Sequence, residues 1–207
     1  MKQILQDIKN GKTSIVNVPI PVIKKNGLLI KTCNSLISPG TERMLVEFGR
    51  SNYLNKIRKQ PEKAKIVVEK IRTDGLFATL DAVNSQLDQP LALGYCNAGV
   101  VVESNDPNFS VGDRVASNGN HAEYVSVGKN LCVKIPDKVD DESAAFTVIG
   151  AIALEGIRLI KPELGENIVV SGLGLVGLLA IQILKANGCR VLGIDYNAER
   201  CKLAESF

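Results

Sequence analysis

A short apolar run, Ile168–Val170, leads straight into three glycines with the spacing G-x-G-x-x-G. The run suits a strand buried on both faces, as in a parallel sheet. The stretch that follows, Leu178–Gly188, is apolar almost all round and predicts a buried helix that stops at Gly188. A second apolar run, Val191–Ile194, comes next and ends in an acid. Strand, glycine-rich turn, helix and strand in this order predict a βαβ unit.

The residue types in the turn suit the binding of a dinucleotide. Gly172 permits a tight turn, Gly174 lets the backbone approach a pyrophosphate, and Gly177 lets the helix pack against the strand. The helix start offers N–H groups to an anion. We therefore expect the pyrophosphate to lie on the whole turn, which consists of Gly172, Leu173, Gly174, Leu175, Val176 and Gly177.

The acid after the second strand has the position expected for a ribose-binding carboxylate. Asp195 stands 23 positions after Gly172, close to the spacing of about 20 that is usual for this role. A carboxylate there would repel a 2′-phosphate, so the pattern favours NAD over NADP, although Arg200 lies nearby. A βαβ unit without a ligand remains the alternative interpretation.

Composition excludes several classes of partner. The chain has 207 residues, 23% of them charged, and a net charge of +3, which is too small to indicate nucleic acid. No apolar run reaches membrane-spanning length, and the first residues lack an apolar signal core. The five cysteines are odd in number and form no C-x-x-C pair. We expect a cytoplasmic protein with reduced thiols and with neither a nucleic acid nor a membrane as partner.

The chain before Lys161 predicts a small β-barrel, because short apolar runs alternate with turn residues. A turn is expected at Pro39–Gly40, and apolar stripes predict helices over residues 43–89. A further helix should open at the acids 140–142 and run to Leu159. The predicted domains are therefore residues 1–142, with the helical insertion, then a connecting helix at 143–160 and an incomplete dinucleotide-binding domain at 161–207. The strands are expected within residues 13–21, 27–37, 98–103, 111–116, 122–127 and 132–136.

Several motifs resemble those of the medium-chain dehydrogenase/reductase superfamily, the zinc-type alcohol dehydrogenases and their relatives. Val111–Val115 is similar to its G-D-R-V turn, Ala122–Val125 to its A-E-Y strand, and Lys134–Asp137 to its K-I-P-D segment. Leu93–Val101 takes the place of its P-G-H-E-x-x-G-x-V segment. The resemblance implies an α/β fold in which a GroES-like barrel precedes a Rossmann parallel-sheet domain.

A narrower resemblance is to the dehydrogenase half of bi-domain oxidoreductases of bacterial polysaccharide biosynthesis. It rests on four segments, Ser38–Arg43, Leu93–Gly99, Ala116–Glu123 and Ala145–Leu154. In that group a second dehydrogenase-like domain follows, so the resemblance implies that this chain is truncated.

The resemblance also implies where a catalytic zinc would be bound, and the residues there are unsuitable. The first ligand position falls near Ser38, and the second falls on Tyr95 or Cys96. The third lies in residues 147–152, which contain no Cys, His, Asp or Glu. One cysteine cannot build a zinc site. We therefore predict that the chain holds no zinc.

Without a metal, hydrogen-bond donors would have to polarise the substrate oxygen. Thr41 matches the relay hydroxyl of the family, or stabilises the turn after Pro39–Gly40. Glu42 is a proton donor or an exposed turn acid. Tyr95 donates its phenol to a carbonyl, or only packs. The single histidine, His121, is structural or surface-exposed, or it faces the substrate.

The resemblance implies an NAD(P)-dependent oxidoreductase that acts without zinc, with a sugar or nucleotide-sugar derivative as substrate. Reduction of an activated C=C bond, as in quinone and enoyl reductases, is the alternative within the superfamily. A second alternative is an inactive fragment, because a doubly wound domain needs about six strands and only two are predicted. The partner would then be the rest of a parent protein or, in a homodimer, a second copy.

Overall fold

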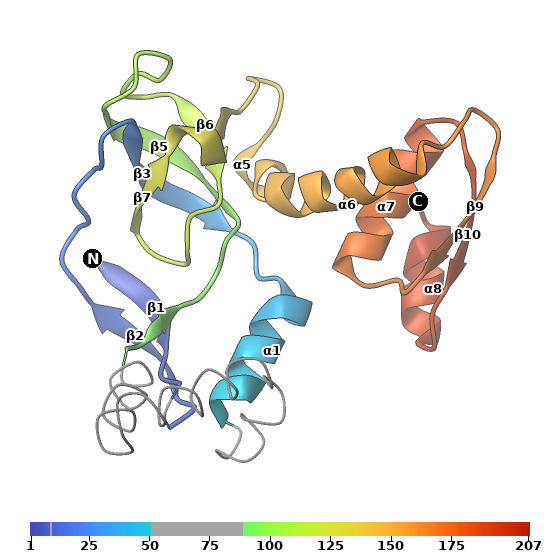
Figure 1. Cartoon of the computed structure of the whole chain (residues 1–207), viewed down its shortest axis with the longest axis horizontal. Coiled ribbons are helices and arrows are strands. Elements are labelled where there is room, and N and C mark those ends of the chain that lie inside the picture. The colour runs from blue at the N-terminus through green and yellow to red at the C-terminus, as the bar shows by residue number, and fades with distance from the viewer. Residues whose placement is uncertain (9, 51–88) are drawn as a thin grey trace, which may run out of the picture.

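The first part of the chain is a set of short antiparallel strands that curl into a β-rich body (Figure 1). The computed structural model describes residues 1–8, 10–50 and 89–207. Five strands follow the order β7-β3-β5-β6-β8, and three follow the order β2-β1-β4. A single bridge between Gln3 and Ala122 links the two sheets. The strands are β1 (Lys2–Gln6), β2 (Thr13–Asn17), β3 (Gly27–Ser35), β4 (Leu91–Ala92), β5 (Asn97–Ser104), β6 (Arg114–Ser117), β7 (Tyr124–Gly128) and β8 (Cys132–Lys134).

The core of this β-rich body comes from the inward side chains of its central strands. β3 and β5 are the longest strands, and they pair with each other in an antiparallel register. Their buried side chains meet those of β6 and β7 in one apolar cluster, which consists of Leu28, Ile30, Val101, Val115, Val125 and Val127. Burial of such β-branched and aliphatic side chains is what stabilises a sheet of this size.

Helix α1 (Pro39–Arg50) begins earlier than the sequence patterns indicated. The Pro39–Gly40 pair was expected to form a turn, but these two residues are the first of the helix. Proline suits this position because its missing N–H would have no partner there. The helix confirms the expected helical insertion only as far as residue 50. The rest of that prediction, at residues 51–88, lies outside the described residues.

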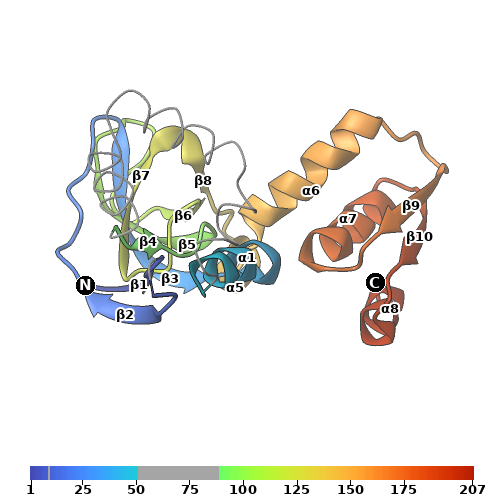
Figure 2. The ribbon, with the colours of Figure 1, turned by 60° about the horizontal axis from the view of Figure 1, so that its bottom comes forward.

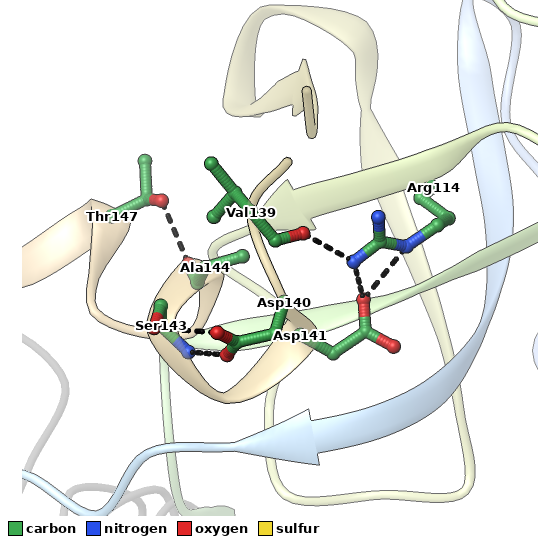
Figure 3. A network of polar contacts seen from close by, with 7 residues as sticks. All are labelled: Arg114, Val139, Asp140, Asp141, Ser143, Ala144 and Thr147. Atoms are coloured by element: carbon green, nitrogen blue, oxygen red, sulfur yellow. Dashed lines mark hydrogen bonds and ion pairs between the residues drawn. The ribbon is translucent and has the colours of Figure 1, made fainter. Parts of the chain in front are cut away.

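The connection between the two halves consists of two helices instead of the single one expected from residue 140 to 159. They are α5 (Asp141–Ala144) and α6 (Thr147–Ile160). Asp140 caps α5 by accepting from the Ser143 backbone, 2.7 Å away. The Thr147 hydroxyl donates to the Ala144 carbonyl at 2.7 Å, and this closes the first helix (Figure 3). Ala145 and Phe146 separate the two helices, and Ala145 is buried against the barrel.

Arg114 of β6 ties this junction to the barrel (Figure 3). Its guanidinium donates to Asp141 and to the Val139 carbonyl, each at 2.7 Å. This ion pair and the buried alanines next to it thus hold α5 against the barrel, directly before α6 begins. Figure 2 shows α6 running from the β-rich body to the last part of the chain.

The last part is the expected βαβ unit. Strands β9 (Asn167–Ser171) and β10 (Arg190–Ile194) are parallel, and α7 (Leu175–Ala186) joins them. A final helix, α8 (Ala198–Glu205), follows β10. α7 ends at Ala186 with Asn187 as its C-cap, and Gly188 takes a φ of +82°, which confirms the expected stop.

One expectation about burial in this unit is wrong. The first strand was expected to be buried on both faces, but Val169 is 59% exposed, and Leu192 of β10 is 61% exposed. The helix α7 was also expected to be buried, yet within it only Ile181 and Leu184 are fully buried. Among the described residues, α6 and α7 cover one face of the two strands, and the opposite face is largely exposed. No described helix is long and apolar enough to cross a membrane.

Candidate functional site

The glycine-rich turn between β9 and α7 has the geometry that its spacing predicts. Gly172 has a φ of +93°, which glycine adopts without strain. Gly174 precedes the first residue of α7 and has an extended backbone. A Cβ on Gly177 would overlap the carbonyl oxygen of Gly172. The turn therefore brings the N-terminus of α7 close to the end of β9, where helix N–H groups can bind an anion.

Asp195 lies beside this turn and holds it in place. Its Oδ2 accepts from the Leu173 backbone at 2.7 Å, and its Oδ1 accepts from the Asn197 backbone at 2.8 Å. These two bonds lower the pKa of the Asp195 carboxyl, and the bond from Asn197 has the larger effect. The nearby Arg200 lowers this pKa further. Arg200 Nη1 is 3.5 Å from Oδ2. A carboxylate offers about four acceptor sites, so Asp195 can still accept from ribose hydroxyls.

One cavity of about 1080 Å³ joins this turn to the barrel side of the molecule. The turn residues Gly172 to Gly177, together with Asp195 and Arg200, line one part of it. Helix α6 contributes apolar side chains, Ile152 and Ile160 among them. Ser38, Thr41 and Tyr95 line the cavity from the barrel side. A cavity of this size can hold a cofactor together with a small substrate.

The three barrel-side residues form a cluster of hydroxyl groups. The Tyr95 hydroxyl donates to Ser38 Oγ at 2.8 Å, and it lies 3.3 Å from Thr41 Oγ1. Thr41 is exposed and Tyr95 is half-buried. The structure thus brings together Thr41 and Tyr95, which were predicted as candidates, with Ser38, which was considered only as a metal-ligand position. We call Ser38, Thr41 and Tyr95 the hydroxyl cluster.

Glu42 and His121 lie behind the hydroxyl cluster and are not among the residues that line the cavity. Glu42 was considered as an exposed turn acid, but it is helical and 7% exposed. His121 is only 6% exposed, so a surface position is wrong for it too. The His121 Nε2 atom is 3.0 Å from Glu42 Oε2. Sequence patterns could not reveal this contact, because the two residues are far apart in the chain and belong to different elements.

The residues near the implied zinc positions do not fit a metal. Burial, and secondarily the charge of Glu42, raise the pKa of the Cys96 thiol to about 11, so this sulfur is protonated near neutral pH. Both ring nitrogens of His121 are within hydrogen-bond distance of other side chains, Glu42 and Ser35. Within the described ranges, no three His, Cys, Asp or Glu side chains are grouped as metal ligands would be. That the chain holds no zinc stays a prediction.

Known proteins similar in sequence are dehydrogenases and reductases. The chain is 30% identical over 148 residues to (R,R)-butanediol dehydrogenase of Bacillus subtilis. The matched segment covers 57% of this chain and 43% of that protein. It is 38% identical over 110 residues to the NADPH-dependent curcumin reductase of Escherichia coli, or 50% of this chain and 32% of that protein. No family model matches the chain. The chain spans less than half the length of these relatives.

Solved structures show the same fold over the whole chain. Galactitol-1-phosphate dehydrogenase of Escherichia coli superposes with a TM-score of 0.75 at 20% identity, covering 100% of this chain and 59% of that one. The quinone oxidoreductase of Coxiella burnetii gives a TM-score of 0.70 at 22% identity, covering 100% and 59%. The fold class is thereby confirmed as a GroES-like barrel followed by a Rossmann parallel-sheet unit.

The relatives and the structural neighbours belong to one class of enzymes. They are medium-chain, zinc-type alcohol dehydrogenases and quinone oxidoreductases. The resemblance to that superfamily, expected from the motifs, is confirmed. The narrower resemblance to bi-domain oxidoreductases stays a prediction.

Proposed function

We propose that this chain carries the cofactor-binding turn and the substrate-polarising hydroxyls of an NAD(P)-dependent oxidoreductase. The observation that supports this most is the shared cavity, in which the Gly172–Gly177 turn and the hydroxyl cluster line the same space. The dehydrogenases and reductases among the relatives support the same class of reaction. Since the chain spans less than half of these relatives, the activity is proposed for the whole polypeptide to which such a unit belongs.

The cofactor roles follow from the geometry of the turn. The N-terminus of α7 and the backbone of Gly174 would bind the pyrophosphate, and Asp195 would accept from the ribose hydroxyls. The bound nicotinamide supplies or accepts a hydride. Asp195 favours NAD, because its charge would repel a 2′-phosphate. Arg200, 3.5 Å from Asp195, is the residue that would accommodate NADP if it turned away from that carboxylate.

The hydroxyl cluster would act on the substrate oxygen. Thr41 is exposed in the cavity, and Tyr95 can donate its proton to either neighbouring hydroxyl or to a bound oxygen. During reduction of a carbonyl, negative charge grows on the oxygen, and a hydroxyl donor both stabilises that charge and delivers a proton. Thr41 and Tyr95 are therefore the proposed catalytic residues. Glu42 and His121 have no contact with the cavity and are assigned a supporting role.

For the substrate we propose a sugar or nucleotide-sugar derivative in polysaccharide synthesis. It is supported by the motif resemblance to bi-domain oxidoreductases, and a galactitol-1-phosphate dehydrogenase is among the structural neighbours. The alternative, reduction of an activated C=C bond, is supported by a quinone oxidoreductase among the same neighbours. In both cases a small molecule is the substrate, and neither a nucleic acid nor a membrane is proposed as a partner.

We further propose the division into residues 1–142, 143–160 and 161–207, and a cytoplasmic location in keeping with the free cysteines of the described residues. The remainder of a parent polypeptide, or a second copy of the chain, would cover the exposed face of β9 and β10. An inactive dinucleotide-binding fragment is the remaining alternative for the chain by itself.

The test of the function is hydride transfer by the whole polypeptide that the gene encodes. Oxidation of NADH or NADPH is followed by its ultraviolet absorbance, with a keto-sugar nucleotide and with a quinone as probes. Turnover that Tyr95→Phe lowers at least about tenfold supports the proposed roles. Unchanged turnover in Tyr95→Phe and in Thr41→Val would refute the assignment of the hydroxyl cluster. Turnover of the quinone alone would favour the alternative substrate class.

A further inference from the structure

Glu42 reaches the hydroxyl cluster from behind, through the backbone of Ser38. Its Oε1 accepts from the Ser38 backbone N–H at 2.8 Å, and its own N–H donates to the Ser38 carbonyl at 3.0 Å. Both backbone groups of Ser38 are therefore bound by one residue. The Ser38 hydroxyl is also the nearer acceptor of the Tyr95 proton. The Glu42 carboxylate therefore holds the backbone of the residue whose hydroxyl accepts from Tyr95.

His121 in turn fixes the Glu42 carboxylate. Its Nε2 is 3.0 Å from Glu42 Oε2, and the two side chains are 5% and 9% exposed. A carboxylate this deeply buried is stable only with a partner that satisfies it. Glu42 Oε2 lies against this imidazole, and Oε1 accepts from the Ser38 backbone.

The ring of His121 is itself held by three other segments. Its backbone N–H donates to the Leu93 carbonyl at 2.8 Å, and its carbonyl accepts from Ile4 at 2.9 Å. Gly94 lies against the ring with a φ of +89°, and a Cβ there would be 2.6 Å from the His121 Cγ atom. Ser35 is bound to the second ring nitrogen, with Oγ 2.9 Å from Nδ1. These contacts place the imidazole between Ser35 and Glu42.

An ionised Glu42 would require the proton on Nε2 of the ring. A carboxylate accepts hydrogen bonds and does not donate them, so Nε2 must be the donor to Glu42. The Ser35 hydroxyl can either donate or accept. It keeps its bond to Nδ1 whether that nitrogen is protonated or not. Both charge states of His121 thus preserve the same contacts, and Nε2 keeps its proton in each.

We propose that Glu42 and His121 form a positioning dyad, in which a protonated His121 Nε2 orients the Glu42 carboxylate and Glu42 orients the Ser38–Tyr95–Thr41 hydroxyls. Neither member touches the cavity, so neither is a catalytic residue. The importance of the dyad for catalysis rests on the proposed function. The contacts of the dyad are tested without measuring turnover.

The first test is nitrogen NMR of the chain labelled with ¹⁵N-histidine. His121 is the only histidine of the sequence, so its two nitrogen signals need no further assignment to a residue. At neutral pH the dyad requires Nε2 to give a protonated, pyrrole-type signal. An unprotonated, pyridine-type Nε2 would overturn the proposal, because that nitrogen could not donate to Glu42.

The substitution Glu42→Gln gives a sharper result, since a glutamine can keep every contact and still reverse the tautomer. Its amide oxygen accepts from Ser38, and its NH₂ donates to Nε2, which must then lose its proton. Nδ1 becomes protonated and donates to Ser35. The Nε2 signal should move to the pyridine-type range. Glu47→Gln is the matched control on the exposed side of the same helix, where Glu47 pairs with Arg43, and it should leave both signals in place. No exchange of signals in Glu42→Gln would contradict the dyad.

The second test measures the hydroxyl cluster directly. Tyrosines labelled at the carbon bearing the hydroxyl report their own hydrogen bonds, and Tyr95→Phe identifies the Tyr95 signal. Glu42→Ala removes both acceptors and should shift that signal, whereas Glu42→Gln and Glu47→Ala should leave it nearly unchanged. If Glu42→Ala does not fold, Glu42→Asp replaces it, because a carboxylate one methylene shorter cannot reach Ser38 and His121 together. An unshifted Tyr95 signal in a folded Glu42→Ala or Glu42→Asp chain would refute the positioning role.

Titration with NADH separates this inference from the proposed function. The Gly172–Gly177 turn belongs to another element, so the folded Glu42 variants should bind NADH as the unaltered chain does. A chain that binds no NADH would count against the proposed function, while the histidine and tyrosine signals would still decide the dyad.

Discussion

The substitution Gly174→Ala separates the binding of a dinucleotide from the stability of the fold. Gly174 has a φ of −77° and a ψ of −171°, which alanine adopts without strain. A Cβ there would meet no heavy atom within 4 Å. The fold should therefore tolerate the methyl group, and the smaller freedom of the unfolded chain should stabilise it by about 0.4–1 kcal/mol. For a chain of this length that is a rise in Tm of roughly 1–4 °C.

Binding should change in the opposite direction. The second glycine of the turn is the one at which the backbone approaches the pyrophosphate, and the open space beside it is where the methyl would project. Loss of one charge-assisted hydrogen bond costs about 1.5–3 kcal/mol, so NADH should bind about 10- to 150-fold more weakly. Thermal unfolding followed by circular dichroism and fluorescence titration with NADH measure the two effects separately.

Two other glycines provide the controls. Gly150 lies in α6 outside the turn, and a Cβ there also meets nothing within 4 Å, so Gly150→Ala should raise stability in the same way and leave the affinity for NADH unchanged. Gly177→Ala should lower stability, because its Cβ would overlap the Gly172 carbonyl. If Gly174→Ala bound NADH as tightly as the unaltered chain, the turn would not be the pyrophosphate site. If Gly174→Ala unfolded the chain, the space beside Gly174 would not be open.

Three further results are expected. The pKa of Asp195 is lowered in the fold. The carboxylate therefore stabilises the fold fully above its ordinary pKa of about 3.9, and this stabilisation is lost as the pH falls through the lower pKa of the folded state. The Tm of Asp195→Asn should fall less steeply with acid than the Tm of the unaltered chain, and equal slopes would contradict this. Gly94→Ala combines a positive φ with a clash against the His121 ring. It should lower the free energy of unfolding, measured in urea, by about 1–3 kcal/mol. A loss below about 0.5 kcal/mol, the range of an ordinary surface change, would show that the ring moves freely. Burial raises the pKa of both the Cys96 and the Cys33 thiol, so exposure decides which of them reacts. Cys96 is fully buried and Cys33 is exposed, and peptide mapping after iodoacetamide at neutral pH should therefore find Cys96 unmodified and Cys33 labelled. Early labelling of Cys96 would argue against its burial.

The βαβ unit could be predicted well because its determinants are local. The spacing of three glycines, one apolar helix and one acid are all read along a single stretch of chain. Even there, the sequence predicted only part of the role of Asp195. Its bond to the Leu173 backbone depends on how β10 lies beside β9, which the spacing from Gly172 does not reveal.

The pairing behind the hydroxyl cluster could not be predicted, because it depends on contacts between distant segments. Glu42 and His121 are 79 positions apart, and each is an unremarkable residue in its own segment. A partial signal was present in Ser38-Pro39, since a proline after a serine is typical of a helix start. Reading that start correctly would have placed Glu42 in the first turn of a helix, facing back toward Ser38.

The boundaries of the connecting helices were mistaken for a similar reason. The acids at residues 140–142 predicted a helix start, and a helix does start there. The break at Ala145 arises from contacts with the barrel, namely the bonds of Arg114 and the burial of the alanines. Apolar periodicity along the chain contains no information about such contacts.

The central claim, that this chain binds a nicotinamide dinucleotide in the Gly172–Gly177 turn with Asp195 on the ribose, is tested most directly by titrating the folded chain with NADH and NADPH in parallel. We predict saturable binding of NADH, weaker binding of NADPH, and loss of the difference between them in Asp195→Ala. A folded chain that binds neither dinucleotide, or one whose preference is unchanged by Asp195→Ala, would contradict the account.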